Sequence, residues 1–401
     1  MTTRFFFIAI ALFLIVACSD DTPVYTNEWD EDVYRFGKEL KDKHVDLFFN
    51  ISESEFDSQI NTLRANSGLW TEDKILFELS KIISQIGDSH TQIVFGSKLP
   101  LYPFRLQLFD DGILLIEIES GKQEYLGKKI LSINDTTIED VIDKFRKVIS
   151  YENESNFKNQ VVLFMLLADY YHQLEISDSP SEITLNFEDG TQTTIQAQNV
   201  ERAQIQTPTT PLFLRDATTF YWFEELPEHQ TLFIQYNACR ERDELSFQSF
   251  TNQITNRIND DTNIQEIILD LRHNGGGNSS IMLPLIDALD EMINTGRFSE
   301  SEIHLIIGRK TFSSAILNTL EIKEKINPIL YGESSGGKPN HYGEVKTFQL
   351  PNSRLTITYS TKYFTHSDNE EDSIHPDVPI GYSSEHFLNG LDPVVEEILK
   401  I

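Results

Sequence analysis

The 401-residue sequence is poor in cysteine and in basic residues, and beyond its first residues it has no apolar stretch long enough to cross a membrane. Two cysteines, Cys18 and Cys239, are too few for a disulfide framework. Lys and Arg number 33 against 63 Asp and Glu, a formal net charge of −30. This balance argues against nucleic acid as a partner, because neutralising phosphates requires basic side chains.

What is present indicates a globular protein. Hydrophobic residues make up 39% and aromatic residues 11% of the chain. A chain of this length can form two or three domains with real cores. The acidic residues are spread along the sequence, which indicates a solvated acidic surface.

The first residues have the pattern of an export signal. Arg4 precedes an apolar segment, residues 5–16, that is too short to span a bilayer. The sequence Ile-Val-Ala-Cys that ends at Cys18 resembles the bacterial lipobox, which implies that Cys18 is lipidated. We therefore expect a lipoprotein signal peptide over 1–17, a tether over 18–29, and a cell-envelope protein lipid-anchored to a bacterial membrane, facing the periplasm or the cell surface.

Three regions follow the tether. Apolar positions at helical spacing predict a helical segment over 30–98. Alternating apolar residues and Asp-Gly turns predict a β-rich module over 99–200, and its strand, Ile-Asn turn and helix resemble a PDZ-type module. A β-rich connecting domain is the alternative. Over 205–401, strand and helix patterns alternate, which favours an α/β domain with a largely parallel sheet.

A glycine turn stands at the centre of the last region. Residues 267–278 read I-I-L-D-L-R-H-N-G-G-G-N, an apolar strand pattern that ends in three glycines. Pro284 and an apolar series then predict a helix with proline in its first turn. Backbone N–H groups at such a turn can face an anion or an oxyanion, and Asp270 and Arg272 are interpreted as its supports. A tight turn without chemistry is the alternative.

A serine, a lysine and a histidine occupy comparable positions. Residues 311–315, Thr-Phe-Ser-Ser-Ala, follow a strand and open a helix, where a serine is an N-cap or a nucleophile. In the loop 332–340, Pro339 replaces the hydroxyl that a phosphate-binding loop needs, so we reject a nucleotide site. Lys338 in that loop is solvent-facing or, when neutral, a proton acceptor for a serine. His90 lies between a helix stop and a strand, which is typical of a structural histidine.

Short motifs spread over about 87–378 resemble, in their order, the tail-specific, or C-terminal-processing, serine peptidases and their tricorn-like relatives (the S41 peptidases). The loop around Lys338 looks more like that of the bacterial lipoprotein members than that of the typical processing peptidases. The resemblance implies a crotonase/ClpP-like α/β core after a helical segment and a PDZ-like module. It also implies a serine-type endopeptidase that forms an acyl-enzyme, needs no cofactor and cleaves proteins or peptides. The motifs are Gly-Asp-Ser-His-Thr, Leu-Asp-Leu-Arg-His-Asn-Gly-Gly-Gly-Asn, Thr-Phe-Ser-Ser-Ala, Gly-Glu-Ser-Ser-Gly-Gly-Lys-Pro-Asn-His-Tyr-Gly-Glu, Leu-Pro-Asn-Ser and Ile-His-Pro-Asp-Val.

The resemblance also implies residue roles. The nucleophile corresponds to Ser314, with Ser313 as the fallback. The base is either Lys338, as in the tail-specific branch, or His90 with Ser89, as in the tricorn-like branch, and solution chemistry favours the histidine. The oxyanion donors would be the N–H groups of Gly275, Gly276, Gly277 and Ala315.

The acid behind His90 is expected among Glu370, Glu371 and Asp372, with Glu371 as the candidate. We predict no metal, because no histidine forms a ligand spacing with another and cysteine ligands are absent. The alternative function is a catalytically silent envelope lipoprotein of the same fold that binds peptides or apolar ligands.

Overall fold

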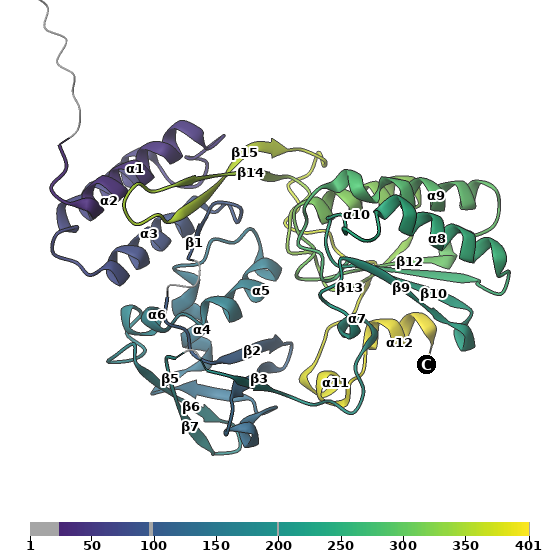
Figure 1. The fold of residues 1–401 in the computed structure, drawn as a ribbon, viewed down its shortest axis with the longest axis horizontal. Helices are drawn as coiled ribbons and strands as arrows, with labels where there is room; N and C mark the ends of the chain where they lie inside the picture. Colours follow the sequence, from purple (N-terminus) through teal and green to yellow (C-terminus); the bar gives the residue numbers. More distant parts are fainter. Residues whose placement is uncertain (1–23, 96–98, 199, 401) are drawn as a thin grey trace, which may run out of the picture.

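The computed structural model describes residues 24–95, 99–198 and 200–400. Figure 1 shows two lobes, one built mainly from residues before about 205 and one mainly from residues after it. We refer to them as the N-terminal lobe and the C-terminal lobe. The predicted signal peptide and Cys18 lie outside the described residues. Within the described ranges, no helix has the length and apolar character needed to cross a bilayer.

Three helices open the N-terminal lobe, each begun by a side chain that accepts a backbone N–H bond: Asn27, Ser52 and Thr71. Gly87, at φ 78°, ends the third helix in the left-handed conformation that suits glycine. Their apolar faces share one core with a hairpin from the far end of the chain. The helices are α1 (Glu28–Lys43), α2 (Glu53–Asn66) and α3 (Glu72–Ile86).

The rest of this lobe is β-rich, as the sequence predicts, and holds a single core between two antiparallel sheets and three helices. The first sheet has the order β2 (Phe104–Phe109), β3 (Gly112–Glu119), β8 (Arg202–Gln204). The second has the order β5 (Thr136–Thr137), β4 (Ile130–Ile133), β6 (Glu182–Phe187), β7 (Gln192–Gln196). The helical elements are η1 (Gln123–Tyr125), α4 (Ile138–Arg146), α5 (Glu154–Phe164) and α6 (Ala168–Gln173).

A six-stranded sheet forms the centre of the C-terminal lobe. Its strands β10 to β13 and β16 run parallel and β9 pairs antiparallel at one edge, so the predicted α/β class with a largely parallel sheet is confirmed. The order is β16 (Val378–Pro379), β13 (Ile329–Gly332), β12 (Ile303–Ile307), β11 (Glu266–Asp270), β10 (Thr231–Tyr236), β9 (Tyr221–Leu226).

Helices cover both faces of this sheet, which is why its strands are apolar on both sides. One face packs against α8 (Phe247–Asp260), α9 (Leu283–Asn294) and α10 (Ser314–Lys325). The other packs against α7 (Leu212–Arg215) and α12 (Pro393–Leu399). The remaining elements are α11 (Ser384–Asn389), η2 (Pro227–His229), η3 (Ser279–Met282) and η4 (Glu300–Glu302).

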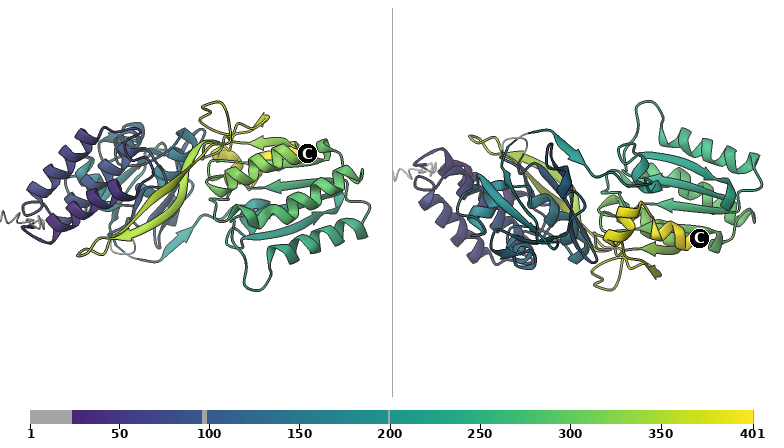
Figure 2. Two further views of the ribbon diagram at one scale, coloured as in Figure 1. Left: turned by 90° about the horizontal axis from the view of Figure 1, so that it is seen from above. Right: turned by 90° about the horizontal axis from the view of Figure 1, so that it is seen from below.

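A hairpin from the C-terminal lobe reaches back to the N-terminal helices (Figures 1 and 2). It consists of β14 (His341–Gln349) and β15 (Thr356–Phe364), and β15 pairs with β1 (Gln92–Val94) of the other lobe. The hairpin begins at His341, shortly after Lys338, and β1 begins at Gln92, shortly after His90. Pairing β1 with β15 therefore brings the lysine loop and the histidine to the same junction between the lobes.

Candidate active site

The glycine turn follows β11 and is fixed by buried charges. Asp270, fully buried, accepts a bond from the Arg272 guanidinium at 2.8 Å, and the same guanidinium contacts both Asp392 oxygens at 3.0 Å. Burial raises the pKa of Asp270 to about 6 against the opposing effect of Arg272. Because Asp392 caps α12, the strand end is tied to that helix, as expected of residues that support the turn.

Two glycines of this turn lie so close to neighbouring residues that a side chain would not fit. Gly276 has φ 103°, and a Cβ there would lie 2.8 Å from the Ser313 Cβ. Gly277 has φ 138°, and a Cβ there would lie 2.2 Å from the Cys239 carbonyl oxygen. The Gly276 N–H donates to the Asn274 Oδ1 at 2.9 Å, whereas those of Gly275 and Gly277 have no acceptor in the described part of the chain.

The serine turn, residues 311–315, faces these glycines. Ser313 has φ 54° and ψ −125°, a strained conformation for a residue with a Cβ, and α10 begins at the next residue. Ser314 Oγ donates to the Gly277 carbonyl at 2.7 Å. The Ala315 N–H donates to the Phe312 carbonyl at 3.1 Å. The Ser313 hydroxyl and the Ser314 N–H have no partner among residues 24–95, 99–198 and 200–400.

The imidazole of His90 is buried beside the serine turn. Its ring stacks on Phe312, the residue before Ser313, with centroids 4.6 Å apart. Its Nδ1 lies 3.5 Å from Glu152 Oε1 and 3.7 Å from Asp88 Oδ1. Neither ring nitrogen makes a hydrogen bond within the described residues. The neighbouring Ser89 hydroxyl is likewise buried and unbonded there.

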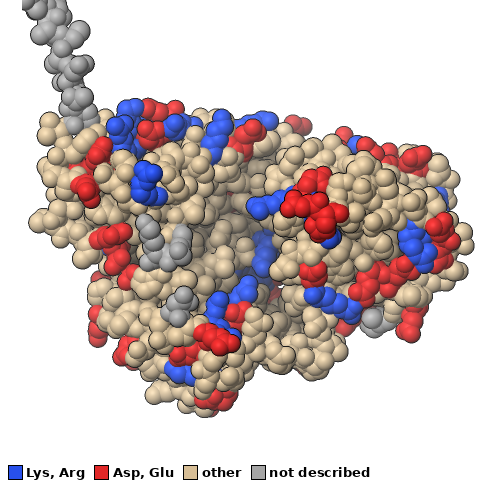
Figure 3. Space-filling model, in the orientation of Figure 1, with Lys and Arg blue, Asp and Glu red and all other residues tan. Residues whose placement is uncertain are grey.

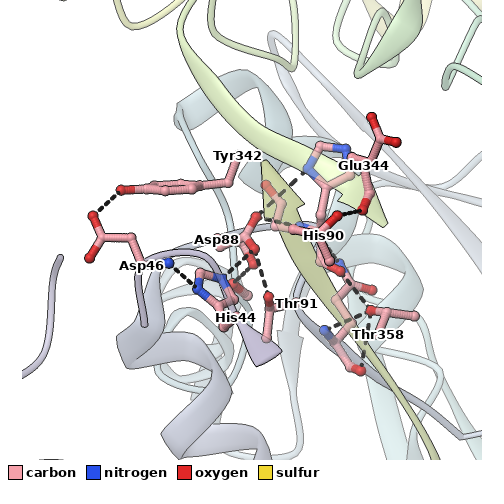
Figure 4. A network of polar contacts seen from close by, with 12 residues as sticks. His44, Asp46, Asp88, His90, Thr91, Tyr342, Glu344 and Thr358 are labelled. Atoms are coloured by element: carbon pink, nitrogen blue, oxygen red, sulfur yellow. Dashed lines mark hydrogen bonds and ion pairs between the residues drawn. The ribbon is translucent and has the colours of Figure 1, made fainter. Parts of the chain in front are cut away.

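Two carboxylates control the charge of this ring. Burial alone would lower the pKa of His90, but Asp88 and Glu152 raise it to about 9. Asp88 stays ionised because, although burial raises its pKa, contacts with His44 and His90 hold that pKa far below its usual value. Figure 4 shows Asp88 between His44 and Thr91. The imidazole is therefore protonated at neutral pH in this arrangement.

The lysine loop, residues 332–340, also packs on the serine turn. Both Gly336 and Gly337 donate N–H bonds to the Thr311 carbonyl, at 3.0 and 3.1 Å. The Lys338 N–H lies 3.3 Å from Glu152 Oε2. The Lys338 side chain is half-buried, and its ammonium has no ion-pair partner in the described ranges. The structure thus gathers the serines, His90, Lys338 and the glycine turn, which are far apart in sequence.

The acidic residues at 370–372 lie elsewhere. All of Glu370, Glu371 and Asp372 are exposed, and Asp372 lies 3.3 Å from His375 instead. No ion pair or hydrogen bond joins any of the three to His90 in the described chain. The structure instead places Glu152 and Asp88 beside the imidazole. The attraction between their negative charges and the imidazolium compensates the cost of removing these carboxylates from water.

Glu152 is the site residue that sequence reasoning missed. It lies between α4 and α5, next to Asn153, which caps α5 and whose buried side-chain amide also donates to the Ser335 carbonyl at 3.1 Å and the Asp372 carbonyl at 2.7 Å. An asparagine at a helix start is visible in the sequence. Nothing local indicates that its neighbour contacts a histidine 62 positions earlier.

Among the described residues, one group of ligand atoms could hold a metal ion. Asp88, His90 and Glu152 each offer an atom within 4.8 Å of the others. The Asp88 oxygens, however, already accept bonds from the His90 N–H at 2.9 Å, the Thr91 hydroxyl at 2.6 Å and His44 Nε2 at 3.1 Å. The ion pair of His90 accounts for this cluster without a metal.

Cys239 is not a second nucleophile. It is buried behind the glycine turn, where its Sγ lies 3.4 Å from Asn274 Oδ1 and 3.3 Å from Asn318 Oδ1. Burial raises the pKa of the thiol to about 11. A protonated, buried thiol is unreactive, so the chemistry of this region rests on the hydroxyls.

Comparison with known proteins supports this view of the fold. No family model and no curated protein matches the sequence. Mature CPAF complexed with lactacystin superposes with a TM-score of 0.65 at 14% identity, over 93% of this chain and 97% of that chain. Mature CPAF gives 0.61 at 13% identity, over 93% and 95%. A protein described as a putative S41 protease, from Bacteroides fragilis, gives 0.41 at 13% identity, over 94% and 97%. The neighbours are S41 family peptidases, and the resemblance predicted from the motifs is confirmed at the level of the fold.

Proposed function

We propose that this chain, which has the fold of the S41 peptidases, is a serine endopeptidase that cleaves proteins or peptides through an acyl-enzyme. The observation that carries the proposal is the conformation of Ser313, φ 54° and ψ −125°, at a strand-to-helix turn that faces Gly276. A nucleophilic serine is commonly held on such a sharp, strained turn, which exposes its hydroxyl at a helix N-terminus.

We assign the nucleophile to Ser313 and not to Ser314, the residue that the motif comparison favours. The Ser314 hydroxyl is engaged by the Gly277 carbonyl at 2.7 Å, and it would lose that bond to attack a substrate. The Ser313 hydroxyl has no such bond in the described chain. Its backbone strain is a cost that an ordinary N-cap would not need.

The same assignment supplies an oxyanion hole. With Ser313 as nucleophile, the N–H of the next residue, Ser314, is available at the start of α10, and the N–H groups of Gly275 and Gly277 are available across the turn. The Gly276 and Ala315 N–H groups are already used within the protein. An oxyanion held by two or more preorganised N–H groups is stabilised where negative charge develops in the transition state.

We propose His90 as the general base, with Lys338 as the rival. His90 would take the Ser313 hydroxyl proton as Oγ attacks the carbonyl carbon, then give it to the departing amine. Water would release the acyl group by the reverse proton path. Glu152 would be a positioning residue that holds the ring and stabilises the imidazolium. Because a base must be neutral, activity should rise with pH toward about 9.

A fluorophosphonate probe with localisation of the modified residue tests the proposal. We expect labelling on Ser313, loss of labelling in Ser313→Ala, and retained labelling in Ser314→Ala. Hydrolysis assays of His90→Ala and Lys338→Ala then identify the base, since only the true base should cost orders of magnitude in rate. A protein that neither reacts nor hydrolyses, yet binds peptides, supports the silent binding protein.

The finer assignments belong to the same proposal. They are a crotonase/ClpP-like core, a PDZ-like module within 99–200, domain boundaries near 30, 99 and 205, and anchoring to the envelope through a lipid on Cys18. Metabolic labelling with a palmitate analogue in wild type and Cys18→Ala tests the anchor.

A further inference from the structure

A group of basic side chains lies in the hollow between the lobes, beside the serine turn. Figure 3 shows Lys and Arg side chains in this hollow, whereas Asp and Glu side chains are frequent on the outer surface. In a chain with a net charge of −30, positive charge at one place is unexpected from composition. We define the basic group as Lys310, between β12 and α10, Arg105, on β2, and Arg202, on β8, whose guanidinium donates to the Phe104 carbonyl of β2 at 3.4 Å.

Lys310 stands closest to the proposed chemistry. It lies three residues before Ser313, in the segment between β12 and α10. The preceding residue, Arg309, donates to the Leu108 carbonyl at 2.7 Å, which fixes this segment against the end of β2. The Lys310 side chain is exposed to solvent, and the protein atoms around its ammonium lower its pKa by desolvation.

The charges around Lys310 are positive. The guanidinium of Arg105, on β2, lowers the pKa of Lys310 further. The pKa of the half-buried His273 is lowered by desolvation first and then by the charges of Lys310 and Arg272. His273 lies two residues before Gly275, so Lys310 also borders the glycine turn. Within the described ranges no carboxylate pairs with the Lys310 ammonium.

The two arginines share a single carboxylate. Glu117 lies 3.1 Å from Arg105 and 3.5 Å from Arg202, and the arginine side chains are 52% and 41% exposed. The neighbouring Arg309 pairs with Asp110 and Glu333, so among these cations Lys310 is the one without a paired acid in the described ranges. A surface with an unpaired cation attracts anionic groups, and low-dielectric walls strengthen that attraction.

We propose that Lys310, with Arg105 and Arg202, forms a subsite for acidic side chains of an extended polypeptide substrate, close to the bond that Ser313 attacks. This inference rests on the proposed peptidase function and specifies its substrate class. A peptide that crosses the hollow between β2 and the serine turn passes Lys310 before it reaches the glycine turn. An aspartate or glutamate at that position of the peptide would form the ion pair with Lys310 that no carboxylate of the described chain forms.

Paired peptides and three variants test the subsite. Cleavage sites are first mapped by mass spectrometry in a mixture of unfolded proteins, and a cleaved sequence is then made with Glu or Gln at each position flanking the bond. We expect wild type to prefer one or more Glu peptides by about 10-fold in kcat/KM, mainly through KM, and the preference to weaken with added salt.

Lys310→Met should remove this preference and leave Gln-peptide cleavage intact, and Lys310→Glu should favour Lys at the same position. Lys323→Met, at the far end of α10, is the matched control and should keep the preference. Equal cleavage of Glu and Gln peptides by wild type, or equal loss of both in Lys310→Met, would overturn the subsite.

A binding measurement separates this inference from the function on which it rests. Fluorescence anisotropy with Ser313→Ala compares the same peptides without turnover. One outcome is that wild type hydrolyses no peptide while Glu peptides still bind more tightly than Gln peptides and Lys310→Met abolishes that difference. In that case the peptidase proposal fails and the acidic subsite stands. If Glu and Gln peptides bind Ser313→Ala equally, the subsite is refuted whether or not wild type is active.

Discussion

The serine turn of the C-terminal lobe and the histidine pocket of the N-terminal lobe meet at one junction but are built by different means. The serine turn is positioned by backbone: strand ends, glycines without Cβ atoms, and the strained Ser313. The histidine pocket is positioned by charge, since His90 stands between Asp88 and Glu152. The comparison teaches that the serine turn should be sensitive to shape and the pocket to pH.

Replacing each of the two serines by alanine in turn should reveal the largest difference in activity. Ser313→Ala should lower kcat/KM by about 10⁴-fold or more, because it removes the attacking atom, whereas Ser314→Ala should cost at most about 10-fold, since it removes only a bond to Gly277. Steady-state kinetics on one peptide measures both. A larger loss of kcat/KM in Ser314→Ala than in Ser313→Ala would show that Ser314 is the nucleophile.

A methyl group in the glycine turn tests the shape requirement. Gly276→Ala places a Cβ 2.8 Å from the Ser313 Cβ and should lower kcat by about 100-fold or more through displacement of that serine. Gly121→Ala is the matched control, because Gly121 has φ 101° but open space around it. Wild-type activity in Gly276→Ala would contradict the proposed contact between turn and nucleophile.

Neutralising Glu152 tests the charge requirement. The acidic limb of the wild-type profile of kcat/KM against pH should have its midpoint near pH 9, because His90 must lose its proton. Glu152→Gln removes one charge that raises the pKa of His90, so the limb should move toward lower pH. The plateau of kcat/KM should fall by about 10-fold, because the imidazolium loses a carboxylate that stabilises it. Asp372→Asn should leave the limb unchanged. If the limb moved in Asp372→Asn and not in Glu152→Gln, the acid that assists His90 would be among residues 370–372, as the sequence predicts.

The smallest effect concerns stability. The pKa of His90 is raised on folding, so its charged form stabilises the protein fully below about pH 6.5, and this contribution is lost as pH rises through about 9. Urea unfolding of wild type and His90→Gln should differ by at most about 3 kcal/mol at pH 6, and the difference should shrink by pH 9.5. His375→Gln, at an exposed position, serves as control. A gap independent of pH would mean that the ring contributes packing alone.

The same contrast explains what the sequence could predict. The glycine turn, the serine pair and Lys338 lie directly after strands, where periodicity and turn residues are legible, and the order of their motifs indicated the fold family. The α/β class with a largely parallel sheet followed from alternating strand and helix patterns. These features depend on local sequence.

The features that sequence did not predict depend on contacts between distant segments or on a single dihedral angle. Glu152 meets His90 across 62 positions, and no motif surrounds it. Ser313 and Ser314 are identical in chemistry, and only the backbone conformation distinguishes their hydroxyls. The acids at 370–372 fitted a spacing, but spacing does not state which carboxylates are buried.

The pairing of β1 with β15 orders the events of biosynthesis. Gln92 has its partner at Thr358, so the segment beside His90 cannot dock until Thr358 has been made. A growing or truncated chain that ends before this hairpin would carry the reactive hydroxyl and the glycine turn without a seated imidazole. Under the proposed function, synthesis from the amino end would therefore delay assembly of the serine, the glycine turn and the imidazole until this hairpin has been made.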